Sequence, residues 1–110
     1  MEKPIPMVNS SMLPQFRGQT VRVVGKVHKL TGQTLLLQTS DLGTVEVALN
    51  PDSEISGSQF VEVTGKVSDS SDSDQIREFT TVNIGDDVDM TLVENVVQIS
   101  TAFPALFTEA

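Results

Sequence analysis

Basic side chains recur at alternating positions between residues 20 and 29, where they could contact phosphate groups. Arg22, Lys26 and His28 share one parity, and Lys29 follows directly. In an extended strand, residues two apart point to the same face, so these side chains would form one outward basic row. Rows of lysine and arginine are typical of phosphate contacts in nucleic-acid-binding proteins. The segment therefore indicates either an auxiliary phosphate contact, or a face that is simply solvated or docks an acidic partner surface.

The charge of the chain is divided unevenly. Its 7 basic and 15 acidic residues give a net charge of −8. Residues 1–35 carry five basic residues against one acid (+4), and the remainder carries two basic residues against fourteen acids (−12). Most of the surface would therefore repel a phosphate backbone. We do not expect autonomous, high-affinity binding of nucleic acid.

No motif in the chain fits a catalytic or metal site. The motif Gly85-Asp-Asp-Val-Asp89 lacks the ligand spacing of a calcium loop, so capping of a helix start is its expected role. His28 is the only histidine and cysteine is absent, which argues against a transition-metal site or a catalytic triad. The Gly65-Lys66 pair lacks the upstream glycine and the following Ser or Thr of a phosphate-binding loop. We expect no catalytic residue, no metal and no cofactor.

The elements that must position these residues are mainly strands. Period-two alternation predicts five of them, over residues 20–29, 33–39, 44–49, 60–67 and 75–84. The segments 21–27 and 61–67 agree at five of seven positions, and each places a glycine, Gly25 or Gly65, at an inward position. Inward glycines let strands bend sharply, as closure of a small barrel requires. The fold class is therefore all-β with terminal helices, a five-stranded oligonucleotide-binding (OB) barrel.

Helical signals occur only at the two ends. A short segment from residues 9–11 to Phe16 is limited by Pro14 and ends at Gly18. A long C-terminal helix is predicted over 89–103, capped either by Asp89 or by a Thr91–Glu94 capping box. The predicted organisation is a barrel with its arm and short helix at 1–88, a helix that assembles subunits at 89–103, and a tail at 104–110.

The predicted C-terminal helix has more apolar surface than a small domain can cover. A helix that packs on one core needs an apolar stripe of roughly 100°, and this helix has nearly twice that. Leucine, valine, isoleucine and phenylalanine at 92, 96, 99 and 103 have the 4-3-4 spacing of a helical bundle, and a small serine would let a neighbouring helix approach closely. The residues predicted to contact permanent partners are Leu92, Val93, Val96, Val97, Ile99, Ser100 and Phe103. The alternative is a helix lying flat on its own barrel.

No segment has the roughly 20 consecutive apolar residues of a membrane span. The first six residues also lack the apolar core of a secretory signal, and the absence of cysteine is compatible with a reducing compartment. We expect a soluble intracellular protein with no membrane partner. The Ser/Asp-rich segment 68–74 is expected to be a flexible loop, in which Ser71 with Asp74 could alternatively serve an acid-directed kinase.

Taken together, the order and spacing of several short motifs resemble a known family. They are Met12-Leu-Pro-Gln-Phe16, Val24-Gly-Lys-Val27, Gly43-Thr-Val-Glu-Val47, Glu54-Ile-Ser-Gly57, the segment 61–67, Val93-Glu-Asn-Val-Val97 and Phe103-Pro104. Over nearly the whole chain, the pattern is similar to the smallest subunits of replication protein A, the eukaryotic heterotrimer that coats single-stranded DNA. The resemblance implies one OB barrel whose C-terminal helix joins a helix from each of two larger OB-fold subunits in a three-helix bundle. It also implies a nuclear complex acting in DNA replication, repair and recombination.

The barrel itself lacks the usual means of gripping single strands. OB proteins stack bases on aromatic side chains of strands 2 and 3, at roughly 1–3 kcal/mol per base, but no aromatic residue lies between residues 33 and 49. The segment 68–74 carries three carboxylates and no cation. We therefore expect single-stranded DNA to be bound mainly by the partners, with the basic row as a possible auxiliary DNA contact. The alternatives are the smallest OB subunit of the telomeric single-strand-binding trimer and an acidic, self-associating adaptor with no DNA role.

Overall fold

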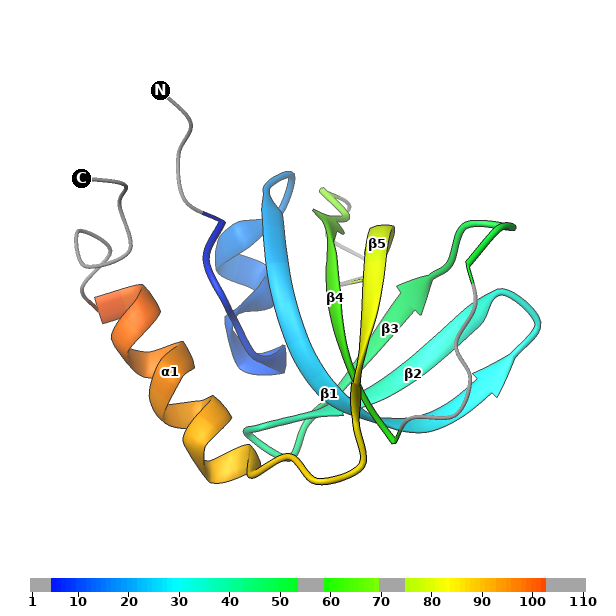
Figure 1. Ribbon diagram of the computed structural model, residues 1–110. Helices are drawn as coiled ribbons and strands as arrows, with labels where there is room; N and C mark the ends of the chain where they lie inside the picture. The colour runs from blue at the N-terminus through cyan, green and yellow to red at the C-terminus, as the bar shows by residue number, and fades with distance from the viewer. Residues whose placement is uncertain (1–4, 54–58, 70–74, 103–110) are drawn as a thin grey trace.

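A computed structural model of the 110-residue chain describes residues 5–53, 59–69 and 75–102. Along the chain a 3-10 helix is followed by five strands and a C-terminal α-helix (Figure 1). The elements are η1 (Ser10–Phe16), β1 (Thr20–Thr31), β2 (Thr34–Thr39), β3 (Thr44–Ala48), β4 (Phe60–Val67), β5 (Ile76–Gly85) and α1 (Met90–Ala102). The prediction of five strands between terminal helices is therefore confirmed. Within the described ranges, no helix has the length and apolarity needed to traverse a membrane.

The five strands form a closed barrel in the order β1-β2-β3-β5-β4. All pairs are antiparallel except β3 and β5, which run parallel through Val47 with Ile76 and Ala48 with Arg77. The long strand β1 pairs with β4 through its first half and with β2 through its second. This is the arrangement of an OB-fold barrel.

Two inward glycines lie where a neighbouring strand leaves little room for a side chain. At Gly25, β1 pairs with both β2 and β4, and an added Cβ would lie 3.0 Å from the carbonyl oxygen of Gln38. At Gly65, which adjoins a register shift between β4 and β5, an added Cβ would overlap the carbonyl oxygen of Arg77 and lie 2.7 Å from Cγ2 of Ile76. The backbone approaches too closely at both places for a side chain.

The barrel interior is filled by branched aliphatic side chains from all five strands. Leu13 of η1 and Val8 of the N-terminal arm close it from one side, each 1% exposed. The strand residues of this core are Val21, Val23, Leu35, Leu37, Val45, Val47, Val61, Val63, Val67 and Ile76. Burial of each such side chain stabilises the fold by roughly 1.5–3 kcal/mol.

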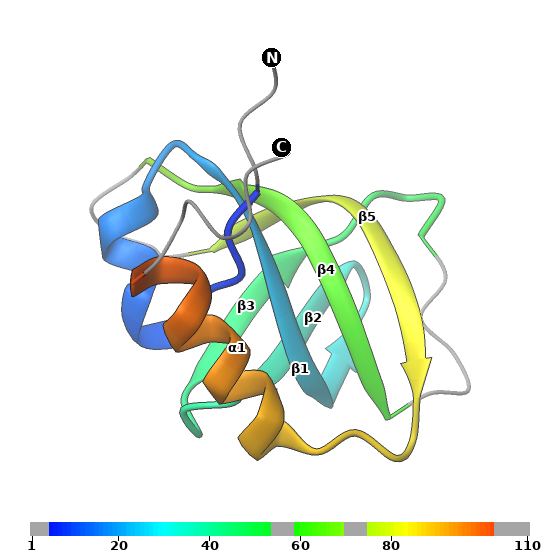
Figure 2. The same cartoon turned by 60° about the vertical axis from the view of Figure 1, so that its left-hand side comes forward.

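A second apolar cluster joins α1 to the outside of the barrel. It consists of Met7, Val24 of β1 and Val97 of α1, with partly buried Met90 and Val93 packed against it. Met12 is partly buried, packs against both clusters and so links them. Figure 2 shows α1 running beside β1 and crossing in front of η1.

The N-terminal arm covers an edge of β1. The backbone N–H of Val8 donates to the carbonyl oxygen of Arg22, and the N–H of Arg22 donates to that of Pro6, both at 2.9 Å. These bonds form a parallel bridge between Met7 and Arg22. The arm lies between α1 and β1 (Figure 1). It satisfies backbone groups that an exposed strand edge would leave open to another chain.

Candidate functional site

Helix α1 begins at a carboxylate cap. Oδ1 of Asp89 accepts hydrogen bonds from the backbone N–H groups of Thr91 at 2.9 Å and Leu92 at 3.4 Å. Its carbonyl oxygen accepts the first helical bond, from the N–H of Val93 at 3.2 Å. Of the two caps predicted from the sequence, the structure uses Asp89. The carboxylate of Glu94 contacts other parts of the chain.

One half of the apolar surface of α1 faces the barrel. Val97 is 1% exposed and packs against Met7 and Val24, whereas Val93 is partly buried beside them. The Ser100 hydroxyl is also buried and accepts a hydrogen bond from the backbone N–H of Met7 at 3.3 Å. This placement differs from the sequence-based expectation, which assigned all three to a partner. The chain's own arm occupies the space that was expected to admit a neighbouring helix.

The other half of the apolar surface faces solvent. Leu92, Val96 and Ile99 are 61%, 41% and 43% exposed, and their 4-3 spacing places them along one line of the helix. We call these three residues the outer stripe. Phe103, predicted to continue the stripe, lies outside the described residues. Burying such side chains against a partner would be favourable, because each leaves water on contact.

A groove of about 330 Å³ runs beside the outer stripe, between α1 and the end of β5. Its apolar lining extends beyond the helix to Ile84 of β5 and to Val88 in the segment before α1. The sequence pattern did not single out Ile84 as an interface residue, because it lies within the segment predicted as the fifth strand. The accessible apolar surface thus spans the helix and the barrel wall.

A carboxylate fixes the rotation of α1 about its axis. Glu94 accepts hydrogen bonds from Nδ2 of Asn9 at 3.1 Å, from Oγ of Ser40 at 2.6 Å and from Nε2 of Gln98 at 2.6 Å. Burial raises the pKa of Glu94, but the bonds from Ser40, Gln98 and Asn9 outweigh it and lower the pKa below its usual value. Because Asn9 precedes η1 and Ser40 follows β2, Glu94 ties the helix to both, which keeps the outer stripe turned outward.

A second carboxylate holds the turn below α1. Burial raises the pKa of Asp41, but hydrogen bonds from Thr39, Ser10 and the backbone N–H groups of Ser11 and Gly43 lower it to about 2. The Ser10 hydroxyl donates at 2.9 Å and the Ser11 N–H at 3.0 Å. The turn between β2 and β3 is thereby fastened to the start of η1.

The lowered pKa of Asp41 should make the free energy of unfolding depend on pH. The pKa of Asp41 is about 2 in the fold and 3.8 ordinarily, so its contribution is complete above about pH 4 and is lost as the pH falls toward 2. Asp41→Asn should therefore lower the free energy of unfolding at pH 6 by about 1 kcal/mol, after discounting for solvent screening, and by clearly less at pH 2, where the carboxyl is already half protonated in the fold. Urea unfolding at both pH values measures this, and an equal difference at both would contradict it.

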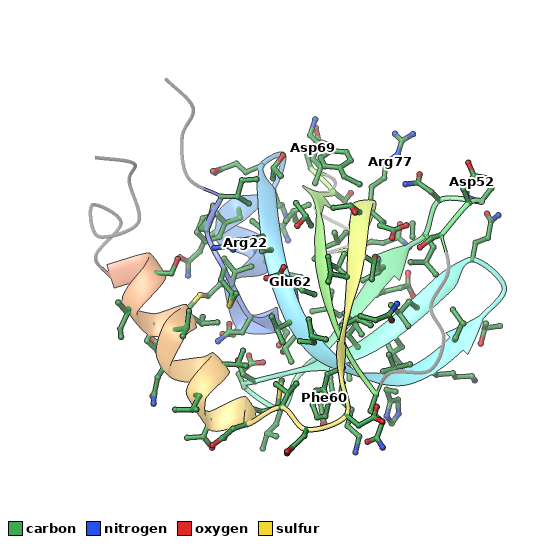
Figure 3. All side chains as sticks on the ribbon, in the orientation of Figure 1. Arg22, Asp52, Phe60, Glu62, Asp69 and Arg77 are labelled. Carbon is green, nitrogen blue, oxygen red and sulfur yellow. The ribbon has the colours of Figure 1, made fainter. Side chains whose placement is uncertain are left out.

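The predicted basic row is only partly accessible. Nη1 of Arg22 lies 3.9 Å from Oε2 of Glu62, and its Nε donates to the carbonyl oxygen of Ile5 at 3.1 Å (Figure 3). Lys26, His28 and Lys29 are exposed, but His28 lies at an irregularity where β1 shifts register against β2. Arg22 therefore differs from the other three basic residues, because its guanidinium already contacts Glu62 and the carbonyl oxygen of Ile5. Only those three present free faces for an auxiliary phosphate contact.

The outer face of β2 and β3 has no stacking platform. Its side chains include Leu36, Thr44 and Glu46, which line a hollow of about 320 Å³, and no aromatic residue lies on either strand. No group of three or more potential metal ligands occurs among the residues that the structure describes. The usual base-stacking chemistry of an OB barrel is therefore missing from this face.

Comparison with known proteins identifies a family and several related structures. The model of the family described as Replication factor A protein 3 matches residues 1–107. Replication factor A protein 3 of Schizosaccharomyces pombe is 32% identical over 109 residues, which is 99% of this chain and 100% of the relative. A chain in the structure of U. maydis Replication protein A bound to ssDNA is 63% identical, with a TM-score of 0.91 over 99% of this chain and 100% of that one. A chain of the S. pombe Stn1–Ten1 complex, at 14% identity, TM-score 0.69 and coverage of 94% and 97%, shares the fold.

Proposed function

Because the chain belongs to the replication factor A protein 3 family, we propose that it is the smallest subunit of replication protein A, a heterotrimer that binds single-stranded DNA. In this complex it is a non-catalytic structural subunit, and it works in the nucleus during DNA replication, repair and recombination. The 63% identity to a chain of a replication protein A structure bound to ssDNA is the observation that carries this proposal.

The outer stripe supports assembly through α1. Leu92, Val96 and Ile99 are exposed apolar residues on a helix whose opposite face is already packed on the barrel. A helix from each of two larger subunits would cover the stripe and the adjoining groove, with spacing that suits bundle packing. The proposed interface therefore contains fewer residues of the helix than the sequence predicted. It also includes Ile84 on the barrel.

The distribution of charge and aromatic residues supports a structural role. The chain carries a net charge of −8, and its β2 and β3 strands have no aromatic residue. Most of the affinity for single-stranded DNA then comes from the larger subunits, because phosphate contacts and stacking both need groups this face lacks. Lys26, His28 and Lys29 remain candidates for an auxiliary contact.

The telomeric alternative has weaker support. The likeness to the Stn1–Ten1 complex rests on 14% identity and concerns the fold, whereas the family match and the two more similar relatives concern replication factor A. The self-associating adaptor would use the same outer stripe to bind a second copy of this chain. Partner identity separates all three.

The direct test is purification of the tagged full-length chain under native conditions, followed by mass spectrometry and a gel-shift assay with oligo(dT). We expect two larger OB-fold subunits and binding of the oligonucleotide. Telomeric partners, or recovery of this chain alone, would contradict the proposal. The full-length chain is required because deletion of α1 would uncover Met7 and Val24 as well as the interface.

A further inference from the structure

Two basic residues stand side by side on an otherwise acidic part of the chain. Lys66 of β4 pairs directly with Arg77 of β5, and they are the only basic residues after residue 35, among fourteen acids. Both are exposed, and neither forms a salt bridge with a carboxylate in the described ranges. Like charges directly opposite on neighbouring strands are destabilising. The stability of the barrel therefore does not account for the pair.

An exposed aromatic ring lies beside this pair. Phe79 is 54% exposed, and it falls at a register shift, where Thr64 pairs with Thr80 and Gly65 with Glu78. Phe79 is thus the extra residue of a bulge on β5. Bulges redirect side chains, and this one turns a phenylalanine outward instead of into the core.

The three side chains line one hollow of about 310 Å³, near the lower limit of typical ligand pockets, roughly 300–1,000 Å³. Among the lining residues that the structure describes, Asp69 is the one acid, against two cations. Figure 3 shows Asp69 and Arg77 at the same end of the barrel. Glu78 does not neutralise Arg77, because it is 3% exposed and its carboxylate accepts hydrogen bonds from the Asn50 N–H at 2.9 Å and the Ser53 hydroxyl at 2.7 Å.

We propose that this hollow binds one nucleotide of single-stranded DNA, with the base stacked on Phe79 and the phosphate held between Lys66 and Arg77. An aromatic face beside paired cations is the chemistry that grips single strands without reading sequence. An acidic peptide would satisfy the cations but would leave the ring without a stacking partner, so a nucleotide is the better fit. The proposal rests on the proposed function and adds a direct DNA contact to it.

This contact is distinct from the exposed part of the basic row, Lys26, His28 and Lys29; Arg22 of that row pairs with Thr64, two residues before Lys66. Lys26 pairs with Phe60 at the start of β4, whereas Lys66 lies six residues further along the same strand, roughly 20 Å away at the rise of an extended strand. It also differs from the β2 and β3 face on which OB barrels ordinarily stack bases.

Photo-crosslinking of the assembled heterotrimer tests the proposal, with an oligo(dT) probe that carries 5-iododeoxyuridine and mass spectrometry of the modified peptides. We expect a crosslink to this subunit at Phe79. Phe79→Leu, and Lys66→Gln combined with Arg77→Gln, should each reduce it roughly five- to hundredfold, with crosslinks to the larger subunits retained. Phe79→Tyr preserves the ring, and Lys66→Arg combined with Arg77→Lys preserves the charges. Both variants should keep the crosslink close to the level of the parent protein.

The outcomes separate this inference from the proposed function. A heterotrimer that binds the probe but shows no crosslink here, or one unaffected by Phe79→Leu, would overturn the nucleotide site alone. Equal loss in the charge-preserving variant would also overturn it. A polyglutamate peptide that occupies the hollow when oligo(dT) does not would assign it to an acidic peptide instead. Failure of the purified protein to join any single-stranded-DNA-binding complex would overturn the proposed function.

Discussion

Replacing Leu92 and Val96 with aspartate should abolish assembly with the larger subunits and leave the barrel folded. Both side chains are exposed in the isolated chain, so the substitutions remove nothing from its own core. At the proposed interface each loses roughly 1.5–3 kcal/mol of apolar burial, and each buries an unpaired carboxylate. The combined loss weakens association by more than about a hundredfold. Co-expression with the partner subunits and gel filtration measure it.

The matched control is Thr91→Asp with Asn95→Asp, which adds the same charge at exposed polar positions of α1. This control should assemble normally, and both variants should keep the circular dichroism spectrum of the parent chain. Recovery of an intact heterotrimer from the Leu92 and Val96 variant would contradict the assigned interface. Val97 is unsuitable for this test because its substitution would disturb the packing on Met7 and Val24.

Gly65→Ala should destabilise the barrel by about 3 kcal/mol. The new Cβ overlaps the carbonyl oxygen of Arg77 on β5, and a backbone oxygen in a paired strand moves only if the pairing moves with it. Gly25→Ala should cost less, because its nearest contacts are at 3.0 Å. Urea unfolding of the parent and both variants provides the comparison.

Gly32→Asn is the control for a glycine in open space. Gly32 has φ +58° and no atom within 4 Å of an added Cβ, and asparagine tolerates this left-handed conformation better than other residues. Its stability should stay close to that of the parent chain. If Gly65→Ala proved equally neutral, the close approach of β4 and β5 would not limit the residue at this position.

The strands could be predicted because their alternation follows directly from burial on one face. The segments 44–49 and 60–67 show this period in sequence, and they match β3 and β4 within one residue at each end. The inward glycines at 25 and 65 indicated closure of the barrel. A glycine at an inward strand position has no side chain and lets the strand bend sharply. Asp89 was recognisable as a cap from its type and position.

Other features depend on contacts that no local pattern contains. The width of the apolar surface on α1 indicated partner proteins, but only the fold shows that Val97 and Ser100 are buried against the chain's own barrel and arm. The salt bridge from Arg22 to Glu62 joins strands that are far apart in sequence. The bulge that exposes Phe79 arises from the register of β4 against β5, which depends on both strands at once.

The hydrogen bond from Met7 to Ser100 spans 93 residues, and this has a consequence for the order of synthesis. Contacts between distant segments form late, because a long loop must close first. During translation the N-terminal arm is synthesised first and α1 last, so their contact can form only when almost the entire chain has been made. The outer stripe therefore takes its final orientation only on a completed polypeptide. A chain broken off early cannot present that surface, and joining the complex thereby selects for full-length, folded copies.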